Sequence, residues 1–185
     1  MHLLESYALT AGCKISKCFI HEEPIELPHK KYITLNTYSN RGNSRQYDHW
    51  DQVIDRLLNN VKFNEYTIIQ TGNKEDPKHK NVDTTYLGKT NYHSLAYLIK
   101  NASLHLGIDS FPVHLASHFD IKIVAIYFYY SSTCGPYFSS ADKIRLFEPN
   151  FDKAKPIFNY DDPLRLINTI NPDDIYEAVG DLLNL

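Results

Sequence analysis

Short apolar segments and amphipathic helical segments alternate along this chain, and this alternation constrains the fold more than any other feature. Apolar residues predict strands at 32–36, 66–70, 104–108 and 121–130, the last of which is continuously apolar from Ile123 to Tyr130. Helical spacing of apolar residues separates these strands at 50–58, 92–99 and 112–119. Strands joined through helical crossovers lie parallel, so we expect an α/β, Rossmann-like parallel sheet with helices on both faces.

Both ends of the chain are predicted to be helical. Residues 1–11 place five apolar side chains on one helical face, namely Leu3, Leu4, Tyr7, Ala8 and Ala11, and Gly12 suits a left-handed stop. Near the other end, Asn171 is the expected N-cap of a helix that begins at Pro172. We expect one domain of 185 residues, with an N-terminal helix and connector over 1–31, a core over 32–147, and a return segment with the C-terminal helix over 148–185.

Composition excludes several classes of function. With 19 Lys and Arg against 22 Asp and Glu, the net charge of −3 does not favour a nucleic-acid partner. The longest apolar run is far shorter than the roughly 18 residues that suggest a transmembrane helix. The three cysteines contain no CxxC pair, which argues against a zinc site or a disulfide framework. We therefore expect a cytoplasmic protein without a transmembrane segment.

Polar loops follow all four predicted strands, over 37–45, 71–76, 109–112 and 131–136. The carboxyl ends of parallel strands are where ligands bind in such sheets. Ser39, Arg41 and Arg45 lie in the first loop, and Ser110 opens a helix whose N-terminal amides favour an anion. The pattern predicts a site for a phosphorylated ligand. Two structural alternatives stay open, because loops are polar in general and Ser110 also suits a helix N-cap.

A metal site is a weaker interpretation of the same region. His114 and His118 fall one turn apart on the predicted helix, and Asp109 could add a carboxylate to them. This set would suit a metal-dependent phosphohydrolase, but no Glu separates the histidines as it does in zinc proteases. We expect no bound metal.

Several segments, taken in order, resemble the family 9 glycosyltransferases, the group typified by the lipopolysaccharide heptosyltransferases. The matching segments are 32–36, 45–50, 68–72, 86–90, 106–116, 123–127 and 135–136. The most specific is 106–116, which contains Asp109, Ser110 and His114. The resemblance covers residues 1–185, but it extends only to the nucleotide-sugar-binding C-terminal half of the two-domain fold known as GT-B.

The resemblance implies a phosphate-binding role for three residues. Arg45 stands where the family usually has a lysine that contacts the donor pyrophosphate, and Asp109 and Ser110 match the acidic and hydroxyl positions at the helix start that hold donor phosphates. His114 matches a position typical of the family, either in direct contact or in a supporting role. Phe111 departs from the pattern, because the family generally has glycine there; the bulky ring is expected to narrow or close the phosphate pocket.

The resemblance also implies a nucleoside-binding region. Glu75 or Asp76, after the second strand, lies where an acidic residue would meet the ribose, and the two remain equal candidates. Thr90 and Asn91 fall near the expected base-binding region. A nucleotide sugar is the substrate in this interpretation, and no separate cofactor is expected.

The implied activity is inverting transfer from a nucleoside-diphosphate sugar, with an ADP-heptose-like donor. The acceptor site and the general base would lie in the absent N-terminal domain, so this chain is expected to be incomplete as an enzyme. A separate acceptor-binding chain or a second copy could supply them, and the apolar face of the first helix could dock such a partner or pack back on its own domain. The alternative function is a catalytically silent nucleotide-binding or assembly module that keeps the half-fold.

Overall fold

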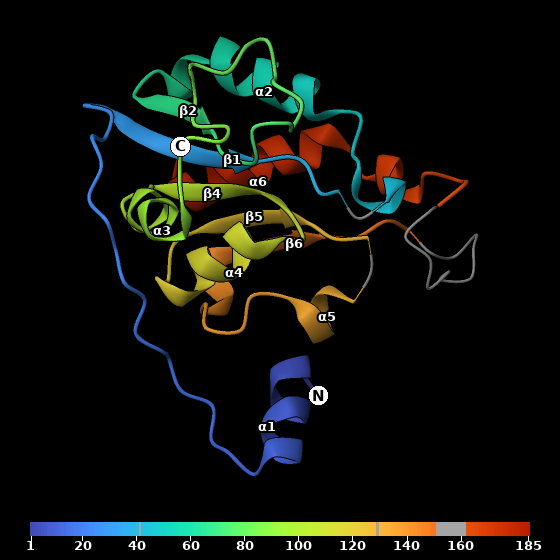
Figure 1. The fold of residues 1–185 in the computed structure, drawn as a ribbon. Helices are drawn as coiled ribbons and strands as arrows, with labels where there is room; N and C mark the ends of the chain where they lie inside the picture. Colours follow the sequence, from blue (N-terminus) through green and yellow to red (C-terminus); the bar gives the residue numbers. More distant parts are fainter. Residues whose placement is uncertain (41, 129, 151–161) are drawn as a thin grey trace.

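Six parallel strands form one sheet at the centre of the molecule (Figure 1). The computed structural model describes residues 1–40, 42–128, 130–150 and 162–185. The strands are β1 (Lys31–Asn36), β2 (Tyr66–Gln70), β3 (Thr84–Thr85), β4 (Leu104–Ile108), β5 (Ile123–Ile126) and β6 (Ile144–Phe147). Their order in the sheet is β3-β2-β1-β4-β5-β6, which confirms the predicted α/β, Rossmann-like fold.

Helices cover both faces of the sheet (Figure 1). On one face, α2 (Trp50–Asn59) and α6 (Pro172–Leu183) pack against alternate strand residues such as Leu106 and Val124. On the other face, α3 (Tyr92–Lys100) and α4 (Phe111–His118) pack against Ile123, Ala125 and Tyr127. The strands are buried on both sides, which explains why their sequences are apolar runs rather than alternating patterns.

The starts of the helices are fixed by local hydrogen bonds. As predicted, Asn171 caps α6, its Oδ1 accepting a hydrogen bond from the amide of Asp173 at 3.1 Å, and Pro172 occupies the first position. At α3, Asn91 Oδ1 accepts from the amides of His93 and Ser94, both at 2.9 Å. Ser94 Oγ in turn accepts from the Asn91 amide at 2.9 Å, completing a capping box.

The fourth predicted strand is shorter than expected. It ends at Ile126 rather than at Tyr130, and the last ladder bond runs from the Tyr127 amide to Phe147 O at 2.8 Å. Tyr130 then adopts a left-handed conformation with φ 61°, and the short helix α5 (Ser131–Cys134) begins in what was predicted to be a loop. Continuous hydrophobicity over 123–130 therefore reflects burial beyond the strand as well as within it, since Tyr127 and Phe128 are both buried.

Some short elements were not predicted. The edge strand β3 has two residues, and β6, at the other edge, exposes Arg145 at its centre. The 3-10 helices η1 (Asn43–Arg45), η2 (Val61–Phe63), η3 (Ala141–Lys143) and η5 (Leu166–Thr169) are each shorter than a periodic pattern can reveal. Most of the predicted irregular return over 148–163 lies outside the described residues.

The N-terminal helix α1 (Leu3–Ala11) forms as predicted and ends at Gly12, which has φ 64°. None of its residues is buried, however, so the domain does not cover the apolar face as fully as the packing alternative predicts. Polar contacts hold α1 beside α5 instead: His2 Nε2 lies 3.0 Å from Gly135 O, and the His2 ring lies 4.8 Å from that of Tyr137 (Figure 1). The connector that follows is extended, and Ile20 packs against the core of the α3 and α4 face.

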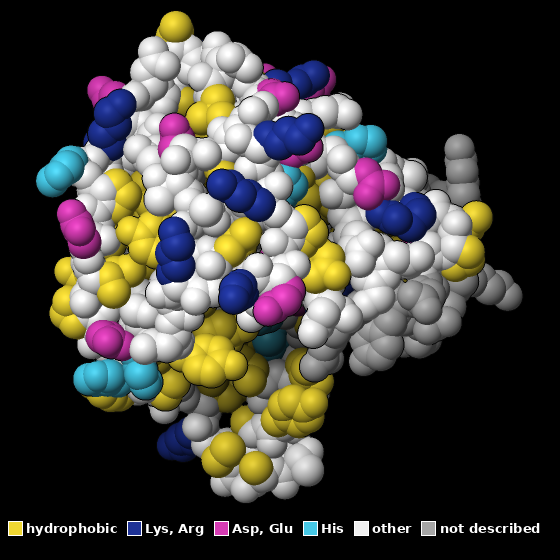
Figure 2. All heavy atoms as spheres, turned by 45° about the horizontal axis from the view of Figure 1, so that its top comes forward, with side chains coloured by type: hydrophobic (Ala, Val, Ile, Leu, Met, Phe, Trp, Pro, Cys, Tyr) yellow, Lys and Arg dark blue, Asp and Glu magenta, His cyan; other side chains and the backbone are white. Residues whose placement is uncertain are grey.

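The surface carries both signs of charge. Figure 2 shows Lys and Arg side chains interspersed with Asp and Glu across one face of the molecule. Among the described residues, no helix is sufficiently long and apolar to span a membrane. Cys13, Cys18 and Cys134 are all free thiols.

Candidate functional site

The strand order reverses between β1 and β4, and the carboxyl ends of these two strands form the centre of the candidate site. The connections that follow β1 and β4 lead to helices on opposite faces of the sheet, which opens a crevice where ligands bind in such folds. Ser110 Oγ donates a hydrogen bond across this crevice to Asn36 Oδ1 at 2.6 Å. Asn36 Nδ2 donates to Thr71 O at 3.3 Å, so the loops after β1, β2 and β4 are tied together at this point.

The prediction that Ser110 caps α4 is wrong, and the local sequence explains the difference. An N-cap hydroxyl accepts from the amide two or three residues later. Pro112 has no amide hydrogen, and the Val113 amide donates to Ser110 O at 3.2 Å. The Ser110 hydroxyl is therefore released from the helix and bonds Asn36 and the Ile108 carbonyl, the latter at 3.2 Å.

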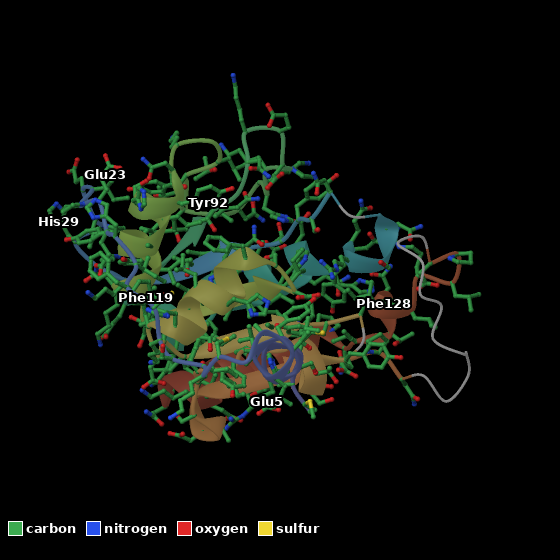
Figure 3. The ribbon with its side chains drawn as sticks, turned by 60° about the horizontal axis from the view of Figure 1, so that its bottom comes forward. Glu5, Glu23, His29, Tyr92, Phe119 and Phe128 are labelled. Carbon is green, nitrogen blue, oxygen red and sulfur yellow. The ribbon has the colours of Figure 1, made fainter. Side chains whose placement is uncertain are left out.

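Two cavities flank this crevice, and the predicted site residues divide between them. The first, here called the Ser110 cavity, has a volume of about 420 Å³ and is lined by Ser39, Asp76 and Ser110 among others. The second, the Arg45 cavity, has a volume of about 480 Å³ and is lined by Arg45, Asp109 and His114. Part of its wall is formed by Leu3 and Leu4 of α1 and by Phe128 after β5. Phe128 and Glu5, which lies on α1, are labelled in Figure 3.

Arg45 and Asp109 are paired with each other. Arg45 Nη2 lies 2.7 Å from Asp109 Oδ2, and Nη1 donates to Asp109 O at 3.3 Å. Both side chains are largely shielded from water, with 28% and 17% of their surface exposed. An incoming phosphate would therefore compete with the Asp109 carboxylate for the guanidinium group. His114 Nε2 lies 3.9 Å from Asp109 Oδ1, which is too long for a hydrogen bond, and its ring faces the Arg45 cavity.

Neutral groups surround this ion pair. Burial raises the pKa of the Tyr127 phenol, and the nearby Asp109 carboxylate adds to the shift. Burial likewise raises the pKa of the Cys134 thiol, again reinforced by Asp109. Cys134 is therefore protonated at neutral pH and poorly suited to act as a nucleophile. The Tyr127 hydroxyl is buried without a hydrogen-bond partner within the described part of the chain.

The acidic candidates after β2 take different positions. Asp76 is half-buried, lines the Ser110 cavity and accepts a hydrogen bond from the Asn73 amide through Oδ2 at 2.8 Å. Its carboxylate folds so closely over Gly72 that a Cβ there would lie 2.3 Å from Oδ2. Glu75 is exposed and does not line either cavity. Of these two acidic residues, Asp76 is the one placed to contact a ligand bound in the Ser110 cavity.

The remaining predicted residues of this region are placed as follows. Thr90 and Asn91 both line the Ser110 cavity, but Asn91 is committed to capping α3 and donates through Nδ2 to Glu23 Oε2 at 2.7 Å. Arg41 lies outside the described residues. Of the two predicted effects of Phe111, narrowing or closing the pocket, closing does not occur in the Ser110 cavity: Phe111 lines it, and its ring is 49% exposed and meets the ring of Tyr92 edge to face, with centroids 5.5 Å apart.

One supporting contact was missed by the sequence analysis. His79 Nδ1 lies 2.6 Å from Asp51 Oδ1 of α2, and its Nε2 lies 2.9 Å from Thr37 Oγ1 just after β1. His79 thereby fixes the loop after β2 against the loop after β1, which form adjacent walls of the Ser110 cavity. Nothing local in the sequence signals this contact, because His79 and its two partners, Asp51 and Thr37, are far apart along the chain.

The described residues contain no group of three His, Cys, Asp or Glu side chains that could hold a metal ion. His118, the second histidine of the metal interpretation, packs against the rings of Phe119 and Phe138. Burial lowers its pKa, and the charge of Lys17 acts in the same direction. The structure thus gives His118 a packing role.

Comparisons with known proteins identify the family of this chain and support its fold. The model of the family described as "Glycosyltransferase family 9 (heptosyltransferase)" matches residues 13–156. A search of curated protein sequences gives no match. The fold is similar to that of ADP-heptose lps heptosyltransferase II from E. coli, with a TM-score of 0.64 and 16% identity over 97% of this chain and 51% of that one.

Two further solved structures are similar. A glycosyl transferase of family 9 from Veillonella parvula DSM 2008 gives a TM-score of 0.65 at 15% identity, covering 97% of this chain and 50% of that chain. The dodecameric iron-containing heptosyltransferase TibC, in complex with ADP-D-beta-D-heptose, gives 0.66 at 14% identity, covering 86% and 46%. The chain spans about half the length of these structures, and at such identities the likeness shows the fold alone.

Proposed function

This chain belongs to glycosyltransferase family 9, and on that premise we propose that it is a donor-binding domain that holds a nucleoside-diphosphate sugar for inverting transfer. The observation that carries the proposal is the Ser110–Asn36 hydrogen bond, which places a hydroxyl and the start of α4 at the crevice between two cavities. A diphosphate bound there would have the nucleoside on one side and the sugar on the other. The domain would correspond to the C-terminal half of a GT-B enzyme.

The roles of the residues follow from their positions. The nucleoside would occupy the Ser110 cavity, where Asp76 can accept hydrogen bonds from ribose hydroxyls. The diphosphate would meet the start of α4, which has few free amides because of Pro112, and the Ser110 hydroxyl, whose single proton would turn from Asn36 Oδ1 to a phosphate oxygen. Arg45 would supply the positive charge by exchanging Asp109 for a phosphate oxygen. Asp109 and His114 would then face the sugar in the Arg45 cavity.

In the transfer step, an acceptor hydroxyl oxygen attacks the anomeric carbon as the bond to the diphosphate oxygen breaks. Arg45 and the start of α4 stabilise the charge that develops on the leaving diphosphate. The proton of the acceptor hydroxyl goes to a general base, and the acceptor site and this base would come from a separate acceptor-binding chain, a second copy or a further segment of the protein. No cofactor other than the sugar donor enters the proposal, and the free cysteines fit a cytoplasmic location.

A second candidate function is a silent nucleotide-binding or assembly module. The completed Arg45–Asp109 pair favours it, because two groups needed for the donor already satisfy each other. Sugar transfer by the chain together with an acceptor-binding partner would eliminate this alternative.

Calorimetric titration of the full chain with ADP and with ADP-heptose tests the proposal. Arg45→Ala removes the cation and leaves the Asp109 carboxylate without its partner beside the bound diphosphate, so the variant should raise the Kd by about 10-fold. Ser110→Ala should weaken binding by a smaller factor. Arg145→Ala is the matched control, because Arg145 is exposed on the edge strand β6, away from both cavities. Equal affinities in the wild type and all three variants would contradict the assignment.

A further inference from the structure

The Ser110 cavity has two chemically different walls. One wall comes from the starts of α3 and α4 and carries the apolar side chains of Tyr92, Leu95, Phe111 and Pro112 beside the polar Asn91 and Ser110. The other wall comes from the loops after β1 and β2 and is polar, formed by residues such as Ser39, Asn73 and Asp76. A ligand that fits both walls must itself have one flat apolar part and one part rich in hydrogen-bonding groups.

The apolar wall ends in an exposed pair of aromatic rings. Tyr92 is 74% exposed and Phe111 is 49% exposed, and their rings meet edge to face with centroids 5.5 Å apart and planes at 81°. Each residue occupies the first position of its helix, so the two rings project from two separate helix starts. Tyr92 is labelled in Figure 3. Single exposed aromatic residues are ordinary, but two in mutual contact at the rim of a cavity leave apolar ring surface that a ligand can cover.

The backbone that carries each ring is held by its helix start. Asn91 fixes the first turn of α3 through its capping box, and its Nδ2 is tied to Glu23 at 2.7 Å. Ser110, which directly precedes Phe111, is fixed by its hydrogen bond to Asn36. Because this backbone is already ordered, ligand binding has to fix only the two side chains, which favours affinity.

We propose that Tyr92 and Phe111 form a stacking platform for the base of the nucleotide, and this inference rests on the proposed function. A nucleoside combines a flat base with a hydroxyl-rich ribose, so it matches the two walls of the cavity. Phe111 follows Ser110 directly, so a base on the platform stays within reach of a ribose and diphosphate bound at the start of α4. The bulky residue at position 111 thus extends the apolar wall of the cavity rather than closing it.

Binding of three probes to the full chain tests the platform: ADP, adenosine and inorganic pyrophosphate, each titrated by calorimetry. Stacking of a base on an aromatic ring is lost on substitution by alanine, at a cost of roughly 5- to 150-fold in affinity. Tyr92→Ala and Phe111→Ala should each weaken ADP and adenosine by at least about fivefold, while pyrophosphate binding changes less than about twofold. Phe111→Tyr should bind ADP and adenosine as tightly as the wild type does, because it keeps an aromatic ring at this position.

The control variant is Phe19→Ala, since Phe19 is 89% exposed and lies on the connector away from the cavity. It should bind all three probes as the wild type does. Tyr92 and Phe111 are exposed, so their variants are expected to fold, and their unfolding temperatures check this directly.

The outcomes separate the two proposals. If the folded wild type binds neither ADP nor adenosine, the proposed function with an ADP-sugar donor is wrong and the platform is wrong with it. If the wild type binds ADP and both alanine variants bind it within twofold, the proposed function stands and the platform is wrong. If the variants weaken pyrophosphate as strongly as ADP, the two residues shape the phosphate site rather than stack on a base, and the inference is overturned.

Discussion

His105 makes the stability of this protein depend on pH in a way that can be calculated from its position. The residue lies in β4 with no exposed surface, and its Nδ1 lies 3.0 Å from Thr34 Oγ1. Its Nε2 has no hydrogen-bond partner among the described residues. Burial lowers the pKa of His105 from 6.5 to about 3, so the folded protein keeps this ring neutral.

The sign and size of the effect follow from proton linkage. Between pH 6.5 and 3 the unfolded chain binds a proton at His105 that the folded chain does not, so acid favours the unfolded state. The contribution of His105 to stability is fully present above pH 6.5 and is lost as the pH falls toward 3. The slope approaches about 1.4 kcal/mol per pH unit, and the loss between pH 7.5 and pH 5 amounts to about 2 kcal/mol.

Urea unfolding at pH 7.5 and pH 5.0 measures this loss. The wild type should lose about 2 kcal/mol more between the two pH values than His105→Gln, whatever the variant costs at pH 7.5. His29→Gln is the control, because His29 is exposed on the connector, and it should follow the wild type. An NMR titration of the His105 ring gives the same test without a variant. Equal losses in the wild type and His105→Gln, or a ring that gains its proton above pH 5, would refute the reasoning.

Two further predictions concern single residues. Gly107→Ala should lower the free energy of unfolding by about 1–3 kcal/mol, as measured by urea unfolding. The added Cβ would lie 2.7 Å from the backbone oxygen of Asn36, which cannot move without disturbing β1. Unchanged stability would contradict this contact. Cys134 should react with iodoacetamide more slowly than Cys13 and Cys18 at pH 7.5, as followed by mass spectrometry, because it is half-buried and its thiol pKa is raised, whereas the other two are exposed; a faster reaction at Cys134 would contradict it.

The fold was predictable where local signals agree. Buried runs such as 104–108 identify central strands, and the Asn171–Pro172 start identifies α6 independently of any tertiary contact. The edge strands β3 and β6 carry no such signal, because an edge strand is half-solvated and can be short. The exposed apolar side chains of α1 show what periodicity does not predict. An apolar face indicates which side of a helix can be buried, but it does not indicate which surface packs against it.

The site was predictable as a set of loops but not as a set of contacts. The sheet topology brings the loops of Ser39, Asp76 and Ser110 to one edge, and the parallel sheet from which this follows was predicted. Pro112 signals locally that the Ser110 side chain does not cap α4, but the partner that its hydroxyl takes instead, Asn36, is 74 residues away in sequence. Whether Phe111 blocks the cavity depends on Tyr92. Long-range partners decide such alternatives, and a single sequence does not contain their distances.

The Arg45–Asp109 ion pair relates the structure of this domain to the chemistry proposed for it. A largely shielded arginine without a partner would be costly, so Asp109 stabilises the empty site. A diphosphate that takes over the guanidinium group replaces one charge-assisted interaction with another, so Arg45 adds to affinity only the difference between the two. In the proposed function the exchange would also free the Asp109 carboxylate, which lies 3.9 Å from His114 Nε2 in this structure and lines the Arg45 cavity where sugar hydroxyls would lie. Donor binding would then be coupled to the exposure of Asp109 on the sugar side through this one pair of residues.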